Sequence, residues 1–182
     1  CGSFGVIGPF SAEQIDFSAQ FKLESPCMAP SKKRSASRVQ LSPDLPVWYV
    51  PLSPLGSAVR HVAALSPKYH WVGIYLLKGK TLVLGPFLGA PTDHKRIPVG
   101  RGVCGTAVAT GQDQNVPDVR TLDNYLSCSL ETRSELVVLI RDKKGKIRGQ
   151  IDIDSHTVQA FGPEEEKSVR KIADELGERW PA

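Results

Sequence analysis

Two cysteines in the second half of this 182-residue chain could do thiol chemistry. Cys104 lies in GRGVCGTA (100–107), where the glycines and the residues after them predict the start of a short helix. A thiol in the first turn of a helix is close to unpaired N–H groups, and their field favours the thiolate. The alternative is a small buried apolar side chain, which is a common role for a cysteine outside disulfides.

The second cysteine, Cys128, lies in NYLSCSLETRSE (124–135), a polar stretch without periodicity that predicts a loop. A loop thiol is accessible, and Arg133 could stabilise its thiolate. The alternative is an incidental loop cysteine, because a thiol ahead of a segment rich in Ser and Thr is not diagnostic of activity.

Two aspartates alternate with isoleucines in IDIDS (151–155), so a strand would turn both carboxylates to one face and both isoleucines into the core. Asp152 and Asp154 would repel each other, so a folded site that keeps them needs a cation or hydrogen-bond donors. A substrate ammonium would serve, and so would a metal. The alternative is an edge strand with one wet face.

Three further side chains could complete a pocket around these aspartates. Glu135 opens the neighbouring strand of the same predicted hairpin and can lie near them, which would give an acidic cluster suited to a small amine. Trp71 and Tyr75 are four residues apart on another predicted strand and therefore share one of its faces. They could wall a small pocket and hold a cation, or they could be ordinary core.

The remaining composition argues against several classes of protein. No two cysteines have the two-residue spacing typical of zinc ligands, and the four histidines are scattered, so no metal is expected. The net charge of +4 is only mildly basic and does not indicate a nucleic-acid partner, and no apolar run approaches the about 20 residues of a membrane span. The N-terminal residues do not resemble a secretion signal, and the few cysteines predict reduced thiols in the cytoplasm.

Composition divides the chain into a tail, 1–46, and a domain, 47–182. The tail contains several Ser and Pro and a basic patch, SKKRSASR, and shows no amphipathic period, so it is expected to be mostly disordered. The patch is interpreted as solvated rather than as a nucleic-acid contact or a nuclear signal. Met28 is the only methionine, and a start there would remove Cys1 and Cys27 from the thiol inventory.

The periodicity of the domain predicts an α+β fold in which helices flank an antiparallel sheet. Helical spacing of apolar residues predicts three helices, and β-rich runs around a turn glycine predict two hairpins. In chain order the predicted elements are a helix at 55–65, a hairpin at 70–87 turning at Gly79, a helix at 102–110 ended by Gly111, a hairpin at 135–154 turning at Gly145, and a last helix from Pro163 with the buried stripe Val169, Ile172, Ala173, Leu176 and Trp180.

Taken together, these segments resemble the free methionine-R-sulfoxide reductases, which are stand-alone GAF domains. The resemblance covers about residues 52–180, and its specific part is the joint occurrence of GVCG, a second cysteine ahead of RSE, and DIDS. It implies an antiparallel sheet of about six strands flanked by helices. It also implies that a thiolate attacks the sulfur of free methionine sulfoxide, and that a second cysteine closes a disulfide which thioredoxin reduces.

The resemblance implies a role for each candidate residue and no cofactor. Cys128 matches the attacking thiol of the family. The acids that hold the amino group of the substrate match Glu135, Asp152 and Asp154, and the aromatic wall matches Trp71 and Tyr75.

One departure from the family pattern concerns the resolving cysteine. Typical members carry a further cysteine just before the Arg-Ile of RIPVG, and His94 stands there in this chain. Cys104 would then have to close the disulfide, or thioredoxin would reduce the sulfenic acid directly. The rival hypothesis is a GAF module that senses a small ligand or redox state without turnover. The sequence leaves a homodimer open in either case.

Overall fold

The structure is a computed structural model that describes residues 53–123, 125 and 130–180. The predicted tail and Cys128 lie outside these residues. The elements in chain order are α1 (Pro54–Leu65), β1 (Trp71–Lys78), β2 (Thr81–Leu88), β3 (Arg96–Pro98), α2 (Gly102–Thr110), β4 (Gln114–Val116), the 3-10 turn η1 (Val119–Thr121), β5 (Ser134–Arg141), β6 (Ile147–Ser155) and α3 (Pro163–Glu178).

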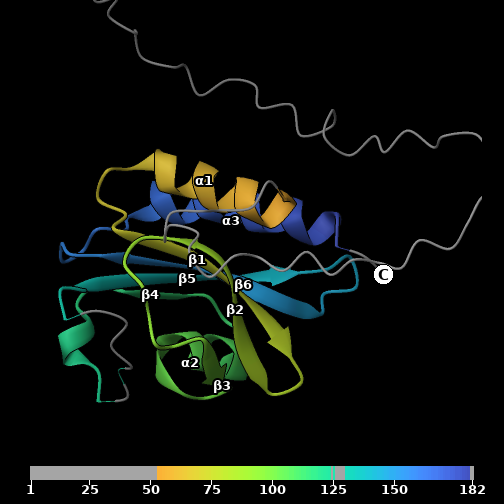
Figure 1. The fold of residues 1–182 in the computed structure, drawn as a ribbon, viewed down its shortest axis with the longest axis horizontal. Helices are drawn as coiled ribbons and strands as arrows, with labels where there is room; N and C mark the ends of the chain where they lie inside the picture. The colour runs from red at the N-terminus through yellow and green to blue at the C-terminus, as the bar shows by residue number, and fades with distance from the viewer. Residues whose placement is uncertain (1–52, 124, 126–129, 181–182) are drawn as a thin grey trace, which may run out of the picture. The chain divides into compact units, whose positions relative to one another are not determined.

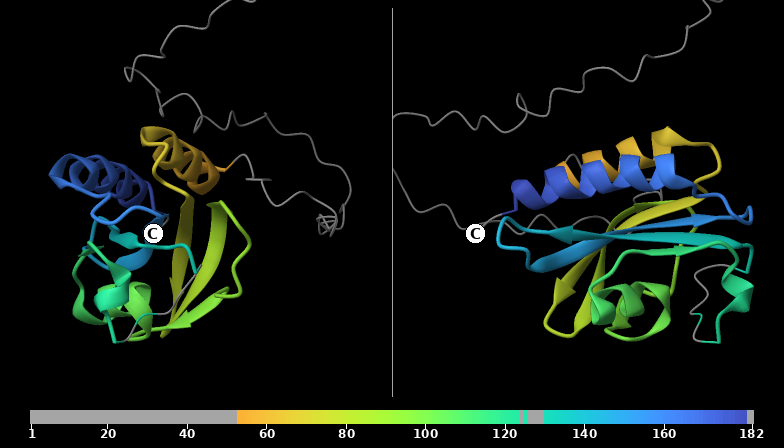
Figure 2. Two further views of the ribbon diagram at one scale, coloured as in Figure 1. Left: turned by 90° about the vertical axis from the view of Figure 1, so that its left-hand side faces the viewer. Right: turned by 180° about the vertical axis from the view of Figure 1, so that it is seen from behind.

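The six strands of the described region form an antiparallel sheet in the order β3-β2-β1-β6-β5-β4. Figures 1 and 2 show α1 and α3 side by side over one face of this sheet, and α2 on the other face. Each face has its own apolar core: Ile151 and Ile153 belong to the core under α1 and α3, and Val137 and Leu139 to the core under α2. The predicted α+β architecture is confirmed, including the six strands that the resemblance implies.

The helix boundaries follow from local signals in the sequence. Ser53 caps α1 by accepting a hydrogen bond from the Gly56 N–H at 3.1 Å, and Pro54 occupies the first helical position. Gly111 ends α2 in the left-handed conformation, with a φ of 68°. The predicted stripe of α3 is buried, and Trp180 just beyond the helix is half-buried against the same core. None of the described helices has the length and apolar character of a transmembrane segment.

Both predicted hairpins are present, and two short strands extend the sheet. The turns lie at Gly79 and Gly145, both with positive φ. The sequence does not predict β3 and β4, because three residues are too few to show alternation. β6 lies inside the sheet between β1 and β5, so the alternative of an edge strand with a wet face is wrong.

Gly177 provides a test of how closely α3 packs on the sheet. A Cβ at this position would overlap the backbone of Arg141, the last residue of β5. Replacing a glycine by alanine inside a helix ordinarily stabilises it by about 1 kcal/mol, but here the new methyl group would overlap main-chain atoms, which cannot rotate away as a side chain can. We expect Gly177→Ala to lower the free energy of unfolding by about 1–3 kcal/mol in urea titrations.

The exposed Lys171 in the same helix supplies the matched control, because Lys171→Ala removes no buried contact. Its stability should stay close to that of the wild type. A Gly177→Ala variant as stable as the wild type, or more stable, would contradict the close approach of α3 to β5.

Candidate active site

β6 places three polar side chains on one face of the sheet. Asp152 and Asp154 alternate with Ile151 and Ile153, as the sequence predicts, and Gln150 extends the polar row. The isoleucines enter the core under α1 and α3, so the polar side chains face α2. Their exposed fractions are 0, 0 and 2%. Carboxylates buried to this degree are unfavourable unless a charge or a set of hydrogen bonds compensates them.

The strand register brings a third acid next to the aspartates. Asp154 is the cross-strand partner of Trp71 on β1 and of Glu135 on β5. Asp152, in the next row on the same face, has Gly73 as its β1 partner. Glu135 is 3% exposed. The structure therefore brings the three predicted acids together with the first residue of the predicted aromatic wall.

Burial and mutual repulsion disfavour the ionised forms of these acids. Burial, followed by the charges of Asp152 and Asp154, raises the pKa of Glu135 well above its usual range. Burial raises the pKa of Asp152 to about 7, against smaller lowering effects of Cys104 and Glu135, and it also raises the pKa of Asp154. None of the carboxylate oxygens of the two aspartates meets hydrogen-bond geometry with a described residue. Cys104 and Glu135 offset only part of the effect of burial on Asp152, and Asp154 has no partner among the described residues, so a cation would stabilise the ionised cluster.

Cys104 approaches the acids from the α2 layer. It is the third residue of α2, as predicted, and its side chain is buried. Its Sγ and a carboxylate oxygen from each of Glu135 and Asp152 all lie within 4.8 Å of one another. The thiol therefore lines the acidic cluster, and the two carboxylates oppose the negative charge that the helix end favours. The sequence does not predict this balance, because it depends on how α2 packs against β5 and β6.

Trp71 and Tyr75 share a face of β1, as predicted, and form an aromatic wall beside the acids. Their ring centroids are 6.3 Å apart, and Trp71 also stacks on Phe87 at 5.6 Å. The indole N–H donates to the Ala90 carbonyl at 3.1 Å, and the Tyr75 hydroxyl donates to the His94 carbonyl at 2.8 Å. Both rings are thereby anchored to the loop between β2 and β3, which fixes their orientation.

Gly73 is a residue of this site that the sequence analysis missed. It lies between Trp71 and Tyr75 on the same strand face, and a Cβ there would overlap the six-membered ring of the indole. The glycine thus lets the indole lie over the strand, next to the row that contains Asp152. The signal in the sequence is a glycine between two aromatics in strand alternation, W-x-G-x-Y, which leaves a space that the larger ring can fill.

Comparisons with known proteins give the family of this fold. Residues 57–180 match the GAF domain. The free methionine-R-sulfoxide reductase of Escherichia coli is 45% identical over 107 residues, which cover 59% of this chain and 64% of that enzyme. The enzyme of the same name from Saccharomyces cerevisiae is 37% identical over 130 residues, which cover 69% of this chain and 72% of that enzyme. The chain belongs to the GAF family, in the group of free methionine-R-sulfoxide reductases.

Solved structures of free methionine-R-sulfoxide reductases share the fold. The type II free methionine-R-sulfoxide reductase of Thermoplasma acidophilum has a TM-score of 0.64 at 40% identity, over 66% of this chain and 85% of its own. The free methionine-R-sulfoxide reductase of Neisseria meningitidis, solved in complex with its substrate, has a TM-score of 0.62 at 33% identity. The match covers 69% of this chain and 76% of that one. The segment matched to the Escherichia coli relative spans slightly less than two thirds of that enzyme.

The family resemblance links positions 94 and 128 to redox chemistry, and the structure describes only the first of them. His94, where the family pattern has a cysteine, lies in the loop between β2 and β3. Its main-chain carbonyl accepts the hydrogen bond from the Tyr75 hydroxyl. Cys128 lies outside the described residues, so its role as the attacking thiol stays a prediction. Arg133, which the sequence offers as a partner for that thiolate, forms an ion pair with Asp118 at 3.2 Å.

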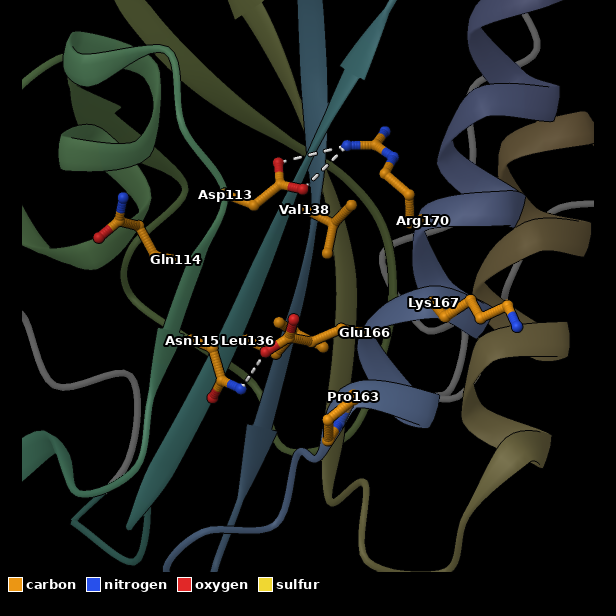
Figure 3. A pocket seen from close by; sticks show the side chains of 9 residues that line it. All are labelled: Asp113, Gln114, Asn115, Leu136, Val138, Pro163, Glu166, Lys167 and Arg170. Atoms are coloured by element: carbon orange, nitrogen blue, oxygen red, sulfur yellow. Dashed lines mark hydrogen bonds and ion pairs between the residues drawn. The ribbon is translucent and has the colours of Figure 1, made fainter.

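A groove of about 400 Å³ between β4 and α3 lies on the other face of the sheet from the acids (Figure 3). The Arg170–Asp113 ion pair at 3.0 Å and the 2.5 Å hydrogen bond from Asn115 to Glu166 cross it from helix to strand. These contacts pair four of the polar side chains that line the groove with each other. None of the predicted site residues lines it, so it is separate from the acidic site.

The raised pKa values of the buried acids predict that the free energy of unfolding of the unliganded protein is lower at neutral pH than at acidic pH. Because the pKa of Asp152 is raised from 3.8 to about 7 in the folded state, the folded chain holds a proton that the unfolded chain has lost. The stability that this proton contributes is present in full below about pH 4 and is lost as the pH rises towards 7. We expect Asp152→Asn to raise the free energy of unfolding at pH 8 by about 1–3 kcal/mol, and this gain should vanish near pH 4.

The half-buried Asp118 offers a control whose pKa is shifted in the opposite direction. The backbone N–H of Arg120 and then the Arg133 side chain lower the pKa of Asp118, so Asp118→Asn should give no stabilisation at pH 8. Thermal unfolding of the unliganded variants between pH 4 and pH 8 makes the comparison. If Asp152→Asn and the wild type are equally stable at pH 8, the pKa of Asp152 is not raised as described.

Proposed function

We propose that this chain reduces free methionine-R-sulfoxide to methionine, with Cys128 as the attacking thiol and Cys104 as the thiol that closes the disulfide. The observation that carries the proposal is the set of three buried acids beside an aromatic wall and a thiol. The Asp154 oxygens meet no partner within the described chain, and a small cation would supply one. The ammonium of a free amino acid, the class of substrate named for the relatives, is such a cation.

In this proposal the ammonium of the substrate lies among Glu135, Asp152 and Asp154. It donates three N–H groups, and each charge-assisted hydrogen bond would stabilise a carboxylate that burial otherwise disfavours. Trp71 and Tyr75 hold the rest of the substrate against their ring faces. A methionine sulfoxide inside a peptide has no such ammonium, because its nitrogen is part of an amide. The site would therefore select the free amino acid over the peptide-bound residue.

The chemistry needs only thiols. The Cys128 thiolate attacks the sulfoxide sulfur, the sulfoxide oxygen takes up a proton, and methionine leaves while the oxygen passes to the cysteine as a sulfenic acid. The Cys104 thiol then attacks the sulfenic sulfur, a disulfide forms and water leaves. A dithiol reductant, which we take to be thioredoxin in the cytoplasm, returns both cysteines to the reduced state. The two electrons come from the thiols, so the proposal needs no cofactor.

The surroundings of Cys104 support a resolving role for it rather than attack on the substrate. The acids within 4.8 Å of its sulfur oppose a thiolate while the site is empty. Cys104 is also held in a packed helix, where its sulfur can receive a bond but has little freedom to follow a substrate. Disulfide formation requires the Cα atoms of Cys104 and Cys128 to lie within about 7 Å when the bond forms.

The second candidate function is a GAF module that binds a small amine-bearing ligand or responds to redox state without turnover. The observation that favours it is His94 at the position of the usual resolving cysteine of the family. Thioredoxin-coupled NADPH oxidation by the purified chain with free methionine-R-sulfoxide separates the two. Sustained oxidation supports the reductase, and ligand binding without oxidation supports the sensor.

Substitution of the acids tests the binding role. Asp152→Asn and Glu135→Gln each remove one charge-assisted contact worth roughly 1.5–3 kcal/mol, so each should raise KM for free methionine-R-sulfoxide at least about tenfold. Both variants should remain as fully folded as the wild type, so the rise in KM reports binding. Glu164→Gln, which changes an exposed acid of α3, is the control and should leave KM as it is. Unchanged kinetics in both buried-acid variants would remove the amine pocket from the proposal.

Substitution of the thiols tests the assigned roles. Cys128→Ser should abolish even a single turnover, because the cysteine of the described residues, Cys104, is buried in a helix and is not the proposed nucleophile. Cys104→Ser should release one equivalent of methionine and then regenerate slowly. Peptide mapping of the wild type after substrate should show a Cys104–Cys128 link.

If Cys128→Ser still completes a single turnover and Cys104→Ser completes none, Cys104 is the attacking thiol and Cys128 the resolving one. If neither change affects turnover, the thiol mechanism fails. Cys27→Ser is the control for cysteines that the proposal does not use, and it should behave as the wild type.

A further inference from the structure

Three side chains from three different elements present metal-binding atoms to one another inside the domain. These are the Sγ of Cys104 on α2 and carboxylate oxygens of Glu135 on β5 and Asp152 on β6, all within 4.8 Å of one another. All three residues are buried, with exposed fractions of 4, 3 and 0%. Sequence spacing gives no hint of such a set, because the three residues are far apart in the chain and form none of the usual zinc motifs.

A fourth side chain points to a positively charged occupant independently of the thiol. Asp154 is 2% exposed, and neither of its oxygens has a hydrogen-bond partner among the described residues. It lies on the same face of β6 as Asp152, two residues further along, and is the cross-strand partner of Glu135. An unpartnered carboxylate at this depth is unfavourable without a cation or a donor next to it.

We propose that Cys104, Glu135 and Asp152 bind one Zn²⁺ ion in the reduced protein, with Asp154 or water as the fourth ligand. Zinc is bound by thiolates at about 2.3 Å and by carboxylates at about 2.0–2.2 Å in a tetrahedral arrangement. The ligand atoms then lie roughly 3.5 Å apart, so the present set needs only a small contraction. The thiol gives up its proton on binding. The thiolate ligand selects zinc or cadmium over Mg²⁺ and Ca²⁺, which prefer oxygen ligands.

Zinc at this site would compete with the reaction proposed above, and this consequence rests on that proposed function. The ion and the ammonium of the substrate need the same carboxylates, so both cannot bind at once. A zinc-bound Cys104 thiolate is also withheld from the sulfenic acid, so the disulfide does not close. One ion would therefore oppose both substrate binding and regeneration.

Calorimetric titration of the reduced protein with zinc chloride tests the site directly. We expect one equivalent to bind, and at least a tenfold weaker affinity in Cys104→Ser and in Asp152→Asn. Cys27→Ser is the matched thiol control and should bind zinc as the wild type does. Magnesium chloride should give no binding. Zinc affinity that is unchanged in Cys104→Ser, or lost equally in Cys27→Ser, would overturn the site.

Cadmium gives a second measurement that does not depend on a fully stable variant. Cd²⁺ added to the reduced wild type should produce an ultraviolet thiolate-to-metal absorption band that persists in Cys27→Ser and is absent after Glu135→Gln. A band of equal size and affinity in Glu135→Gln would overturn the assignment, because the thiolate would then be binding metal elsewhere.

The titration also separates this inference from the proposed function. Zinc binding in a protein that never oxidises NADPH with free methionine-R-sulfoxide would support the metal site and remove the reductase. Sustained turnover in a protein that binds no zinc would support the reductase and remove the metal site. If both hold, zinc should weaken the binding of the sulfoxide to Cys128→Ser, measured by calorimetry with and without zinc.

Discussion

The burial of three carboxylates on one face of the sheet is the constraint on which the rest of this structure depends. Taking a carboxylate out of water is unfavourable unless a charge or a set of hydrogen bonds replaces the water. On the opposite face of β6, Ile151 and Ile153 pack into the apolar core under α1 and α3, which supplies stability that the acidic face does not. The site is therefore preorganised for a positive charge before any ligand arrives, and the fold maintains an arrangement that the acids alone would not adopt.

Short-range patterns made much of this arrangement predictable. The alternation in IDIDS shows which side chains share a face, because the strand repeat is two residues and does not depend on the rest of the fold. Gly79, Gly111 and Gly145 mark turns or a helix end, because each needs a backbone conformation with positive φ. The boundaries of α1, α2 and α3 follow from such local signals, and so does the α+β class.

Contacts between distant segments set what the sequence could not predict. The predicted hairpin brings Glu135 near the two aspartates, but its pairing with Asp154 in particular follows from the register. The approach of Cys104 to these acids depends on how α2 packs on the sheet, and a helix pattern alone does not contain that information. The importance of Gly73 appears only when the orientation of the Trp71 ring is known. The position of Cys128 lies outside the described residues, so the geometry of the attacking thiol still rests on the family resemblance.

The anchoring of the aromatic wall has a consequence for how this domain can change over evolutionary time. Trp71 and Tyr75 hold the loop between β2 and β3 through the main-chain carbonyls of Ala90 and His94. Every amino acid brings a carbonyl, so the wall constrains the path of the loop and not the identity of its side chains. Position 94 can therefore carry a histidine, where the family pattern has a cysteine, without disturbing the aromatic wall. The geometry of the wall and the side-chain chemistry of the loop are thus encoded by separable features of the sequence, and one can change while the other is kept.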